Sequence, residues 1–381
     1  MDRNMKKWHS YKLSDVVRFN PSERLLKGEI AKKVPMDLLQ PYTRGISGFE
    51  MASYTGGSKF RNGDTLMARI TPCLENGKTA YVSMLDEDEV GFGSTEYIVF
   101  RNIEGITDNK FVYYFVTSPW FRDIAVKSMV GSSGRQRVQQ AMLENLVVNL
   151  PPLAEQKQIA GILGALDDKI ELNRRINDNL EEQAKALFKS WFVDSDRNEW
   201  VHYELGDITL ITAGGDRPSK YTNKKTIECY VPIYSNGIDN EGLYGYTDVA
   251  KIHEESITIS ARGTIGYVCL RLEPYVPIVR LISIIPNKKE LSAKYLYLWA
   301  LTQNITGTGT TQQQLTVPIF RKTPISIPSD TKLKQFNSIA DPLFSQIESN
   351  KKENIKLSTL RDTLLPKLMS GELSVEEVSF D

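Results

Sequence analysis

Polar side chains suited to binding a ligand gather in two turns between predicted strands. The first turn is Arg69-Ile70-Thr71-Pro72-Cys73-Leu74-Glu75-Asn76-Gly77-Lys78, and Ala261-Arg262-Gly263-Thr264-Ile265-Gly266 stands at the corresponding place in the other half of the chain. Arg, Lys, Asn, Gln and Thr are the residue types that hydrogen-bond base edges and phosphates of nucleic acids. Because a basic turn recurs, Arg69 and Arg262 are the first candidates for such contacts. The alternative, that these are solvated turn residues, stays open.

Two loops rich in Gly, Ser, Thr and Gln provide the next candidates. They are Gly131-Ser132-Ser133-Gly134-Arg135-Gln136-Arg137 in the first half and residues 307–314 in the second. The full set of predicted DNA-binding residues is Lys59, Arg69, Thr71, Asn76, Lys78, Arg135, Gln136, Arg137, Ser235, Asn236, Arg262, Thr264, Gln312, Gln313 and Gln314.

The sequence contains no recognisable catalytic or metal-binding motif. Gly77-Lys78-Thr79 resembles the end of a phosphate-binding loop, but Pro72 occupies the position of the required first glycine. The three cysteines and three histidines are scattered without metal-ligand or disulfide spacing. No nucleophilic triad or acidic nuclease cluster is visible. We therefore expect a chain with no catalytic residue, no metal and no cofactor of its own.

Length and composition place these turns in an ordinary globular protein. A chain of 381 residues with 41% hydrophobic and 25% charged residues can form two domains, each with its own core. No run approaches the roughly 18 apolar residues that span a membrane, and the first residues lead into no apolar signal core. We expect a cytoplasmic protein without membrane contact. Because the net charge is zero, any DNA-binding face must come from charge segregation on the folded surface.

Two long helices organise the chain. From Leu153 to about Phe192, apolar or small residues recur at alternating intervals of four and three, which indicates a coiled-coil seam. The same seam, with two asparagines at the same places, returns 177 positions later, since 350 − 173 = 177 and 354 − 177 = 177. Ser329 or Asp330 can cap the second helix and Gly371 can end it.

The seam also predicts how the two helices pair. In an antiparallel arrangement with full overlap, partner residues have numbers that sum to 527, so Asn173 faces Asn354 and Asn177 faces Asn350. We expect these amides to fix the register at some cost in stability; the alternative is that they are tolerated at a wet seam. One layer of this register is poor, because it sets Leu166 against Arg361.

Each helix follows one copy of a repeated domain. Trp8-x-x-Tyr11 returns as Trp200-x-x-Tyr203, and short strand-like runs alternate with Gly- and Asn-containing turns in both copies. The fold class is therefore α+β: two tandem mixed domains in pseudo-two-fold arrangement, separated by two long antiparallel coiled-coil helices. We expect the first domain over residues 1–150, the first helix over 151–193, the second domain over 194–328, and the second helix with a C-terminal tail over 329–381.

Several stretches together resemble the specificity subunit of type I restriction-modification enzymes. They are Asn149-Leu150-Pro151-Pro152-Leu153, Leu166-Asp167-Asp168-Lys169-Ile170, Leu187-Phe188-Lys189-Ser190-Trp191-Phe192, Arg69-Ile70-Thr71-Pro72-Cys73 with Glu75-Asn76-Gly77-Lys78, and Ser133-Gly134-Arg135-Gln136-Arg137. The resemblance covers nearly the whole chain. It implies two target-recognition domains, each reading one half of a bipartite, asymmetric site in double-stranded DNA, with the helical pair setting the spacing.

The resemblance also implies partners. Two adenine-specific methyltransferase subunits and two restriction (translocase) subunits would assemble on this chain, and S-adenosylmethionine, ATP and Mg would bind those subunits. Apolar residues beside the seam, Phe188 and Phe192 near one end with Leu365 and Met369 near the other, are our candidates for docking the methyltransferase; the alternative is that they pack against this chain's own domains. A different class remains open: a pseudo-symmetric protein scaffold without sequence-specific DNA binding.

Overall fold

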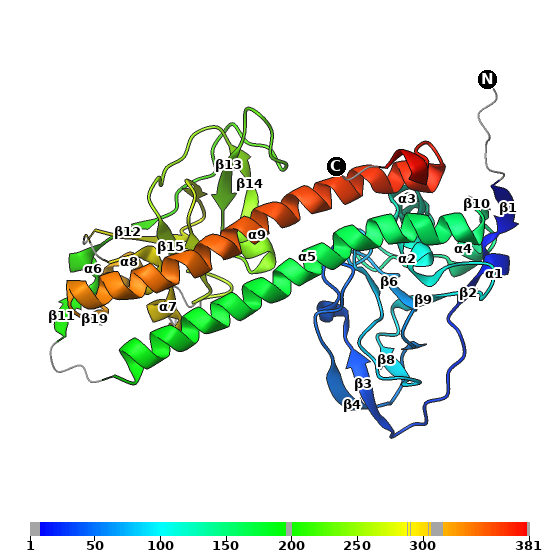
Figure 1. The fold of residues 1–381 in the computed structure, drawn as a ribbon, viewed down its shortest axis with the longest axis horizontal. Helices are drawn as coiled ribbons and strands as arrows, with labels where there is room; N and C mark the ends of the chain where they lie inside the picture. The colour runs from blue at the N-terminus through cyan, green and yellow to red at the C-terminus, as the bar shows by residue number, and fades with distance from the viewer. Residues whose placement is uncertain are drawn as a thin grey trace. The chain divides into compact units, whose positions relative to one another are not determined.

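The chain folds into two compact α+β units. The computed structural model describes residues 8–195, 200–287, 289, 291–303, 305 and 315–378. Unit 1 comprises Met1–Arg174 and Lys351–Asp381, and unit 2 comprises Arg175–Asn350. Each unit contains its own sheets together with one segment of each long helix, α5 (Leu153–Phe188) and α9 (Asp330–Ser370) (Figure 1). The predicted α+β class with two long packed helices is confirmed.

Unit 1 is built on two four-stranded sheets and a short strand pair. The antiparallel sheet has the order β2 (Val17–Phe19), β9 (Tyr97–Asn102), β6 (Thr65–Ala68), β7 (Thr79–Tyr81). The mixed sheet has the order β4 (Glu50–Ser53), β3 (Ile30–Val34), β8 (Gly91–Gly93), β5 (Lys59–Phe60). The strand pair is β1 (His9–Lys12) with β10 (Val147–Leu150), and the helices are α1 (Leu13–Val16), α2 (Asn109–Thr117), α3 (Pro119–Lys127) and α4 (Gln140–Glu144).

Unit 2 repeats this arrangement. Its antiparallel sheet has the order β12 (Thr209–Ala213), β18 (Ile282–Pro286), β15 (Ser256–Ile259), β16 (Val268–Arg271). Its mixed sheet has the order β14 (Leu243–Thr247), β13 (Val231–Tyr234), β17 (Val276–Pro277), and its strand pair is β11 (Val201–Glu204) with β19 (Pro324–Ile327). The helices are α6 (Leu205–Ile208), α7 (Ala293–Leu301) and α8 (Val317–Arg321).

The strand pairings show which residues of the two units are equivalent. His9 pairs with Leu150 and Val201 pairs with Ile327, so the shift is 201 − 9 = 192 at the first strand and 327 − 150 = 177 at the last. In the central sheets Val17 pairs with Asn102 and Thr209 with Pro286, which gives 286 − 102 = 184 at β9 and β18. The two steps, 192 − 184 = 8 and 184 − 177 = 7, account for the shorter second copy.

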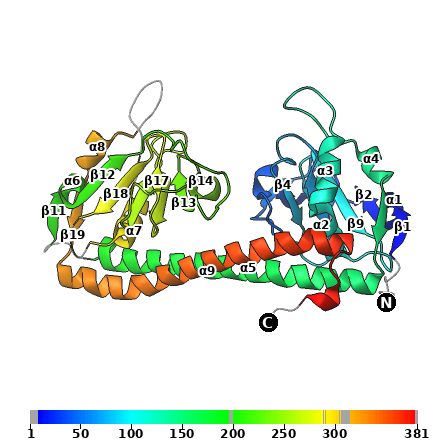
Figure 2. The same cartoon turned by 90° about the horizontal axis from the view of Figure 1, so that it is seen from above.

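The long helices pair as the seam predicted. Within each unit a segment of α5 lies antiparallel beside a segment of α9 (Figures 1 and 2). In unit 1, Asn173 Nδ2 donates to Asn354 Oδ1 at 2.9 Å, and in unit 2, Asn350 Nδ2 donates to Asn177 Oδ1 at 2.8 Å. These are the two predicted pairs, so the antiparallel register is confirmed. Whether the amides specify that register stays a prediction.

The predicted helix ends are close to the observed ones. The Ser329 hydroxyl accepts a hydrogen bond from the Lys332 N–H at 3.4 Å, and Gly371, with φ +73°, follows the last residue of α9. Helix α5 was expected to run to Phe192 as a regular helix. Instead its regular part ends at Phe188 and a π-helical turn covers Lys189–Val193.

Phe188 and Phe192 lie in the core of unit 2. Their rings are 3% and 2% exposed and pack against Tyr295 and Phe336, at centroid distances between 5.0 and 6.0 Å. In unit 1, Leu365 is buried and Met369 packs against the same core. These contacts favour the alternative left open by the sequence, that the four side chains pack against this chain's own domains. Docking of a methyltransferase subunit by these residues stays a prediction.

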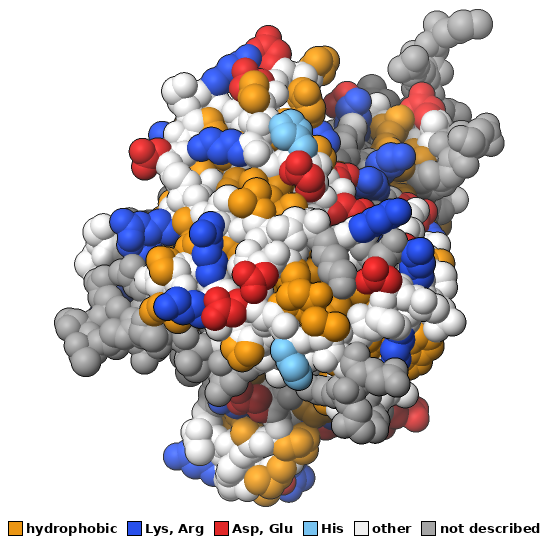
Figure 3. All heavy atoms as spheres, turned by 90° about the vertical axis from the view of Figure 1, so that its left-hand side faces the viewer, with side chains coloured by type: hydrophobic (Ala, Val, Ile, Leu, Met, Phe, Trp, Pro, Cys, Tyr) orange, Lys and Arg blue, Asp and Glu red, His pale blue; other side chains and the backbone are white. Residues whose placement is uncertain are grey.

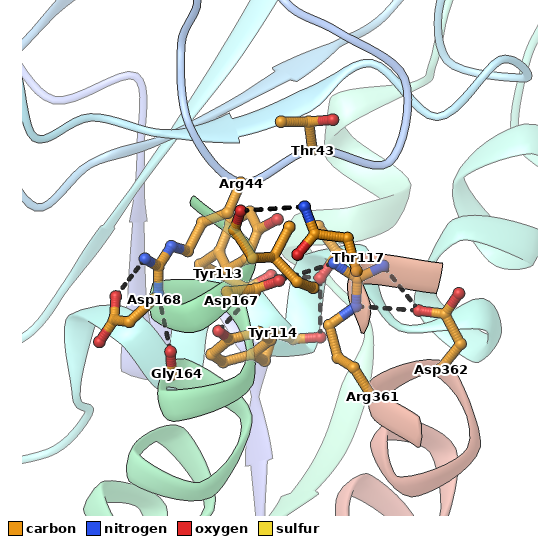
Figure 4. Close-up of polar contacts among 12 residues, drawn as sticks. Thr43, Arg44, Tyr113, Tyr114, Thr117, Gly164, Asp167, Asp168, Arg361 and Asp362 are labelled. Atoms are coloured by element: carbon orange, nitrogen blue, oxygen red, sulfur yellow. Dashed lines mark hydrogen bonds and ion pairs between the residues drawn. The ribbon is translucent and has the colours of Figure 1, made fainter. Parts of the chain in front are cut away.

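Arg361 enters the core of unit 1 as an ion pair. Its Nη1 lies 2.7 Å from Asp167 Oδ1, and Tyr114 donates to Asp167 Oδ2 at 2.7 Å (Figure 4). The Asp167 side chain is only 4% exposed. Neighbouring carboxylates outweigh burial and raise the pKa of Arg361, so its guanidinium stays charged. The layer that seemed poor with Leu166 is thus satisfied by the adjacent aspartate.

The equivalent layer in unit 2 is apolar. The helix shift of 177 relates Asp167 to Phe344 and Arg361 to Ala184, and the shift of 184 relates Tyr114 to Leu298. All three lie in the hydrophobic core of unit 2. The same position of the repeat is therefore filled by an ion pair in one unit and by packing in the other.

This difference predicts how unit 1 responds to substitution. Arg361→Ala leaves the buried Asp167 carboxylate without its cation and should destabilise the protein by about 3–5 kcal/mol. The triple variant Tyr114→Leu, Asp167→Phe, Arg361→Ala installs the residues of unit 2 and should recover most of that loss, because a packed apolar layer can replace a buried pair. Urea unfolding of the full chain, followed by circular dichroism, measures both. A triple variant as unstable as Arg361→Ala would contradict the equivalence of the two layers.

Candidate nucleic-acid interface

The two candidate loops of unit 1 lie side by side. The Gln136 N–H donates to Thr71 Oγ1 at 3.0 Å, and the Thr71 N–H donates to the Gln136 carbonyl at 3.1 Å. The Val138 N–H donates to the Arg69 carbonyl at 2.9 Å, and Arg69 Nη2 donates back to the Val138 carbonyl at 3.2 Å. The turn after β6 and the loop before α4 therefore form one joined surface element.

Within this element the candidates divide into positioning and exposed residues. Thr71 is 9% exposed, and its hydroxyl accepts the Gln136 N–H, so in this structure it positions the neighbouring loop. Direct DNA contact by Thr71 stays a prediction. Arg135 is exposed, next to Gly134 at φ +76°, and its guanidinium makes no ion pair or hydrogen bond with any described residue. Gln136 is half-buried. Arg135 is thus the candidate here with a fully available charge.

Arg137 is compensated by an acid. Its Nη2 lies 2.6 Å from Glu96 Oε1, and its Nε lies 3.0 Å from both carboxylate oxygens. The hydrogen bond to Glu96, followed by Coulomb attraction, raises the pKa of Arg137. Sequence reasoning missed Glu96, which lies 41 residues from Arg137 and carries no local signal.

The remaining candidates of unit 1 differ in availability. Asn76 is exposed at the far end of the turn. Lys78 Nζ donates to the Met36 carbonyl at 2.9 Å, and Lys59 Nζ donates to the Glu23 carbonyl while lying 5.5 Å from the centroid of the Tyr54 ring. Both ammonium groups therefore already hold backbone segments together, and of this group only Asn76 is free to meet a ligand through its whole side chain.

In unit 2, Asn236 joins two turns. Its Nδ2 donates to the Val279 carbonyl at 2.7 Å, and its Oδ1 accepts from the Ala261 N–H at 2.7 Å. Ser235 is half-buried, with its N–H donating to the Gly242 carbonyl at 2.8 Å. The Asn236 side-chain carbonyl and amide both bond within the fold, so in this structure the residue positions its neighbours. Base contact by Asn236 stays a prediction.

Arg262 and Thr264 lie on the turn that Asn236 holds. Both are half-buried. The Leu315 N–H donates to the Ala261 carbonyl at 3.2 Å, the equivalent of the Val138 bond to Arg69, since 261 − 69 = 192 and 315 − 138 = 177. Arg262 is therefore equivalent to Ile70, one residue along from Arg69. The candidates Gln312, Gln313 and Gln314 lie outside the described residues.

Charge is interspersed on the face drawn in Figure 3, where Lys and Arg alternate with Asp and Glu among hydrophobic side chains. That face shows no large field of one sign. Among the described residues no group of His, Cys, Asp or Glu is arranged to hold a metal ion. None of the described helices combines the length and apolarity needed to cross a membrane.

Two copies of one α+β fold, each containing part of a shared helix pair, define a tandem-repeat protein. The chain belongs to the family of type I restriction-modification DNA specificity domains, which matches residues 5–182 and 197–359. The predicted class, a non-catalytic subunit that recognises DNA, is confirmed at this level.

Two relatives agree with this assignment, and one solved structure shares the fold. The chain is 28% identical over 320 residues to the type I restriction enzyme MjaIX specificity subunit of Methanocaldococcus jannaschii, covering 73% of each chain. It is 26% identical over 408 residues to the HindI specificity subunit of Haemophilus influenzae, covering 82% of this chain and 87% of the relative. The crystal structure of a type I S subunit from M. genitalium has the same fold, with a TM-score of 0.55 and 19% identity over 96% of this chain and 97% of that one.

The interface predicts opposite effects for two substitutions in unit 1. Arg135→Ala should leave the free energy of unfolding within about 0.5 kcal/mol of the parent. It should reduce the salt slope, the magnitude of the slope of log K for DNA binding against log salt concentration, by about 1. Thr71→Val should instead cost roughly 1–3 kcal/mol of stability, because the Gln136 N–H loses its acceptor. Fluorescence anisotropy with a labelled duplex at several salt concentrations, and urea unfolding, measure the two effects.

Lys127→Ala is the matched control, since Lys127 is exposed and already pairs with Asp123 at 2.6 Å. It should change neither the salt slope nor the stability appreciably. An Arg135→Ala protein with an unchanged salt slope would remove Arg135 from the interface.

Proposed function

We propose that this chain is the sequence-reading subunit of a type I restriction-modification complex, in which each unit reads one half of a bipartite, asymmetric DNA site. The observation that supports the proposal is that one main-chain hydrogen bond between two chain segments recurs in both units, with different side chains around it. Val138 donates to Arg69 in unit 1 and Leu315 donates to Ala261 in unit 2. Two units with the same backbone fold and different exposed residues are suited to bind two different half-sites.

The helical pair supplies the proposed spacing. Helix α5 has 36 residues and α9 has 41, and at a rise of roughly 1.5 Å per residue each is about 54–62 Å long. Each helix is continuous across the boundary between the units at residues 174/175 and 350/351. A continuous helix resists bending, so we propose that the pair fixes the separation of the half-sites at about one turn of DNA, 10–10.5 base pairs centre to centre.

Partners follow from the family role. We propose that two methyltransferase subunits and two restriction subunits assemble on this chain, and that S-adenosylmethionine, ATP and Mg bind to those subunits. We further propose the functional division into recognition domains over residues 1–150 and 194–328 and helical segments over 151–193 and 329–381. A specificity subunit acting in this way would work in the cytoplasm, where its DNA target lies.

Mapping of N6-methyladenine tests the division between the units. Cells carrying this chain with its methyltransferase subunits should show a split, asymmetric motif that disappears when this chain alone is deleted. Arg135→Ala in unit 1 should weaken methylation or relax the motif in one half-site only, and Arg262→Ala in unit 2 should act only on the other half. Each mismatched or unread position typically costs about 1–3 kcal/mol. Changes in both half-sites from one substitution would contradict the assignment of one half-site to each unit.

A scaffold without sequence-specific DNA contact is the competing function. It predicts an unchanged methylation pattern after deletion of this chain, and binding that does not distinguish the mapped motif from a scrambled duplex. Sequence-specific proteins bind their sites typically 10³–10⁷-fold more tightly than other DNA, so a competition assay at fixed salt separates the two functions.

A further inference from the structure

A turn in unit 2 carries an arginine that neither the sequence patterns nor the family match singles out. Residues 278–281 form this turn, with the Leu281 N–H donating to the Ile278 carbonyl at 3.0 Å. Its two central residues, Val279 and Arg280, have φ of +52° and +60°. Such a pair of positive φ values is typical of turns made by Asn-Gly, and it is rare for other residues and most unfavourable for a β-branched one. Surrounding contacts must therefore impose this backbone conformation.

Three contacts hold the turn in place. Asn236 Nδ2 donates to the Val279 carbonyl at 2.7 Å. The Val279 and Arg280 N–H groups donate to the carbonyls of Gly215 and Gly214, each at 2.9 Å. A Cβ on Gly214 would lie 2.7 Å from the Ile278 nitrogen, so the close approach of the two segments requires glycine there. Because Asn236 also holds the Ala261 N–H, the turn is fixed beside the candidate loop that contains Arg262.

The arginine at the tip is available. Val279 and Arg280 are both exposed, and the Arg280 guanidinium makes no hydrogen bond or ion pair with any described residue. The backbone of this turn is strained at two residues, and its tip presents a cation that no described residue compensates. Strain of this kind gathers at binding sites, where it is retained for its contribution to function.

The repeat shows what differs between the units at this place. Arg280 is equivalent to Glu96, since 280 − 96 = 184, the same shift that relates the paired strands β9 and β18. The turn in unit 1 has the same closing bond, from the Tyr97 N–H to the Ser94 carbonyl at 3.3 Å, but Thr95 and Glu96 do not have positive φ. There Glu96 neutralises Arg137 at 2.6 Å. At this position unit 1 has Glu96, which neutralises the charge of Arg137, whereas unit 2 has Arg280, which adds a positive charge.

We propose that Arg280 binds a DNA phosphate in the half-site read by unit 2 and fixes the position of that unit on the duplex. This assignment rests on the proposed function. Half to two-thirds of protein–DNA hydrogen bonds go to the phosphate and sugar, and a guanidinium held at a fixed point suits a phosphate geometrically and electrostatically. A phosphate contact would set the register of the neighbouring loop, in which Arg262 and Thr264 are the candidates for base contacts.

Arg280→Gln and Arg280→Lys test the assignment in the complex of the full chain with its methyltransferase subunits. The probes are a duplex carrying the motif mapped by methylation and a scrambled duplex of equal length. Arg280→Gln should weaken binding to both duplexes by roughly tenfold, the loss of one charge-assisted contact, and should lower the salt slope by about 1. Arg280→Lys keeps the charge and should retain the salt slope and most of the affinity.

The matched variant is Glu96→Gln in unit 1, which releases Arg137 from its acid. It should raise the salt slope by about 1, because unit 1 then presents an uncompensated cation at the equivalent place. Thermal unfolding of each variant is the control that measures whether the fold is retained.

Each outcome has a definite meaning. A loss confined to the mapped duplex would overturn the phosphate assignment in favour of a base contact, and an unchanged slope in Arg280→Gln would remove Arg280 from the interface. An unchanged slope in Glu96→Gln would overturn the charge argument drawn from the repeat. If the parent complex did not prefer the mapped duplex to the scrambled one, the proposed function would fail, irrespective of Arg280.

Discussion

The antiparallel pairing of α5 with α9 is the constraint on which the rest of the structure depends. In unit 1 the seam places Ile159, Leu163 and Leu368 in the same core as the sheet and α2, and in unit 2 it places Ala184 and Phe336 in the corresponding core. Neither unit can complete its core without a segment of both helices. A slip in helix register would therefore break the two Asn–Asn bonds and also displace the apolar residues that each sheet packs against.

This dependence explains why the loops can vary while the frame stays constant. One main-chain hydrogen bond recurs in both units, from Val138 to Arg69 and from Leu315 to Ala261. In unit 1 the Arg69 and Thr71 side chains add further bonds to it. Main-chain hydrogen bonds are indifferent to the side chains at those positions. The residues around them can then differ in charge and size, as Arg69 and Ala261 do, without loss of the fold. In such a fold, side chains in the loops can change without loss of the main-chain bonds that stabilise it.

Sequence reasoning succeeded where a period or a repeat fixes geometry. A seam of threes and fours leaves few registers, so the pairing of Asn173 with Asn354 followed from position alone. It could not show how a polar side chain is used where the residue type reports only the capacity to bond. Thr71 and Asn236 can read DNA in principle, but their partners lie 65 and 25 residues away and use that capacity inside the fold. For Phe188, helical spacing gave its position beside the seam but could not show that Tyr295 and Phe336 cover it.

The same limit explains the charged residues. Arg361 seemed misplaced in the seam because its layer partner by number was Leu166, whereas its guanidinium reaches the neighbouring Asp167. Arg137 seemed as available as Arg135, but Glu96, in the turn before β9, neutralises it. Ionic partners are set by side-chain reach over several ångströms, which a sequence pattern does not encode. The structure is needed to separate the cations that stabilise a unit from those left for a ligand, and in this fold that separation differs between the two copies of one turn.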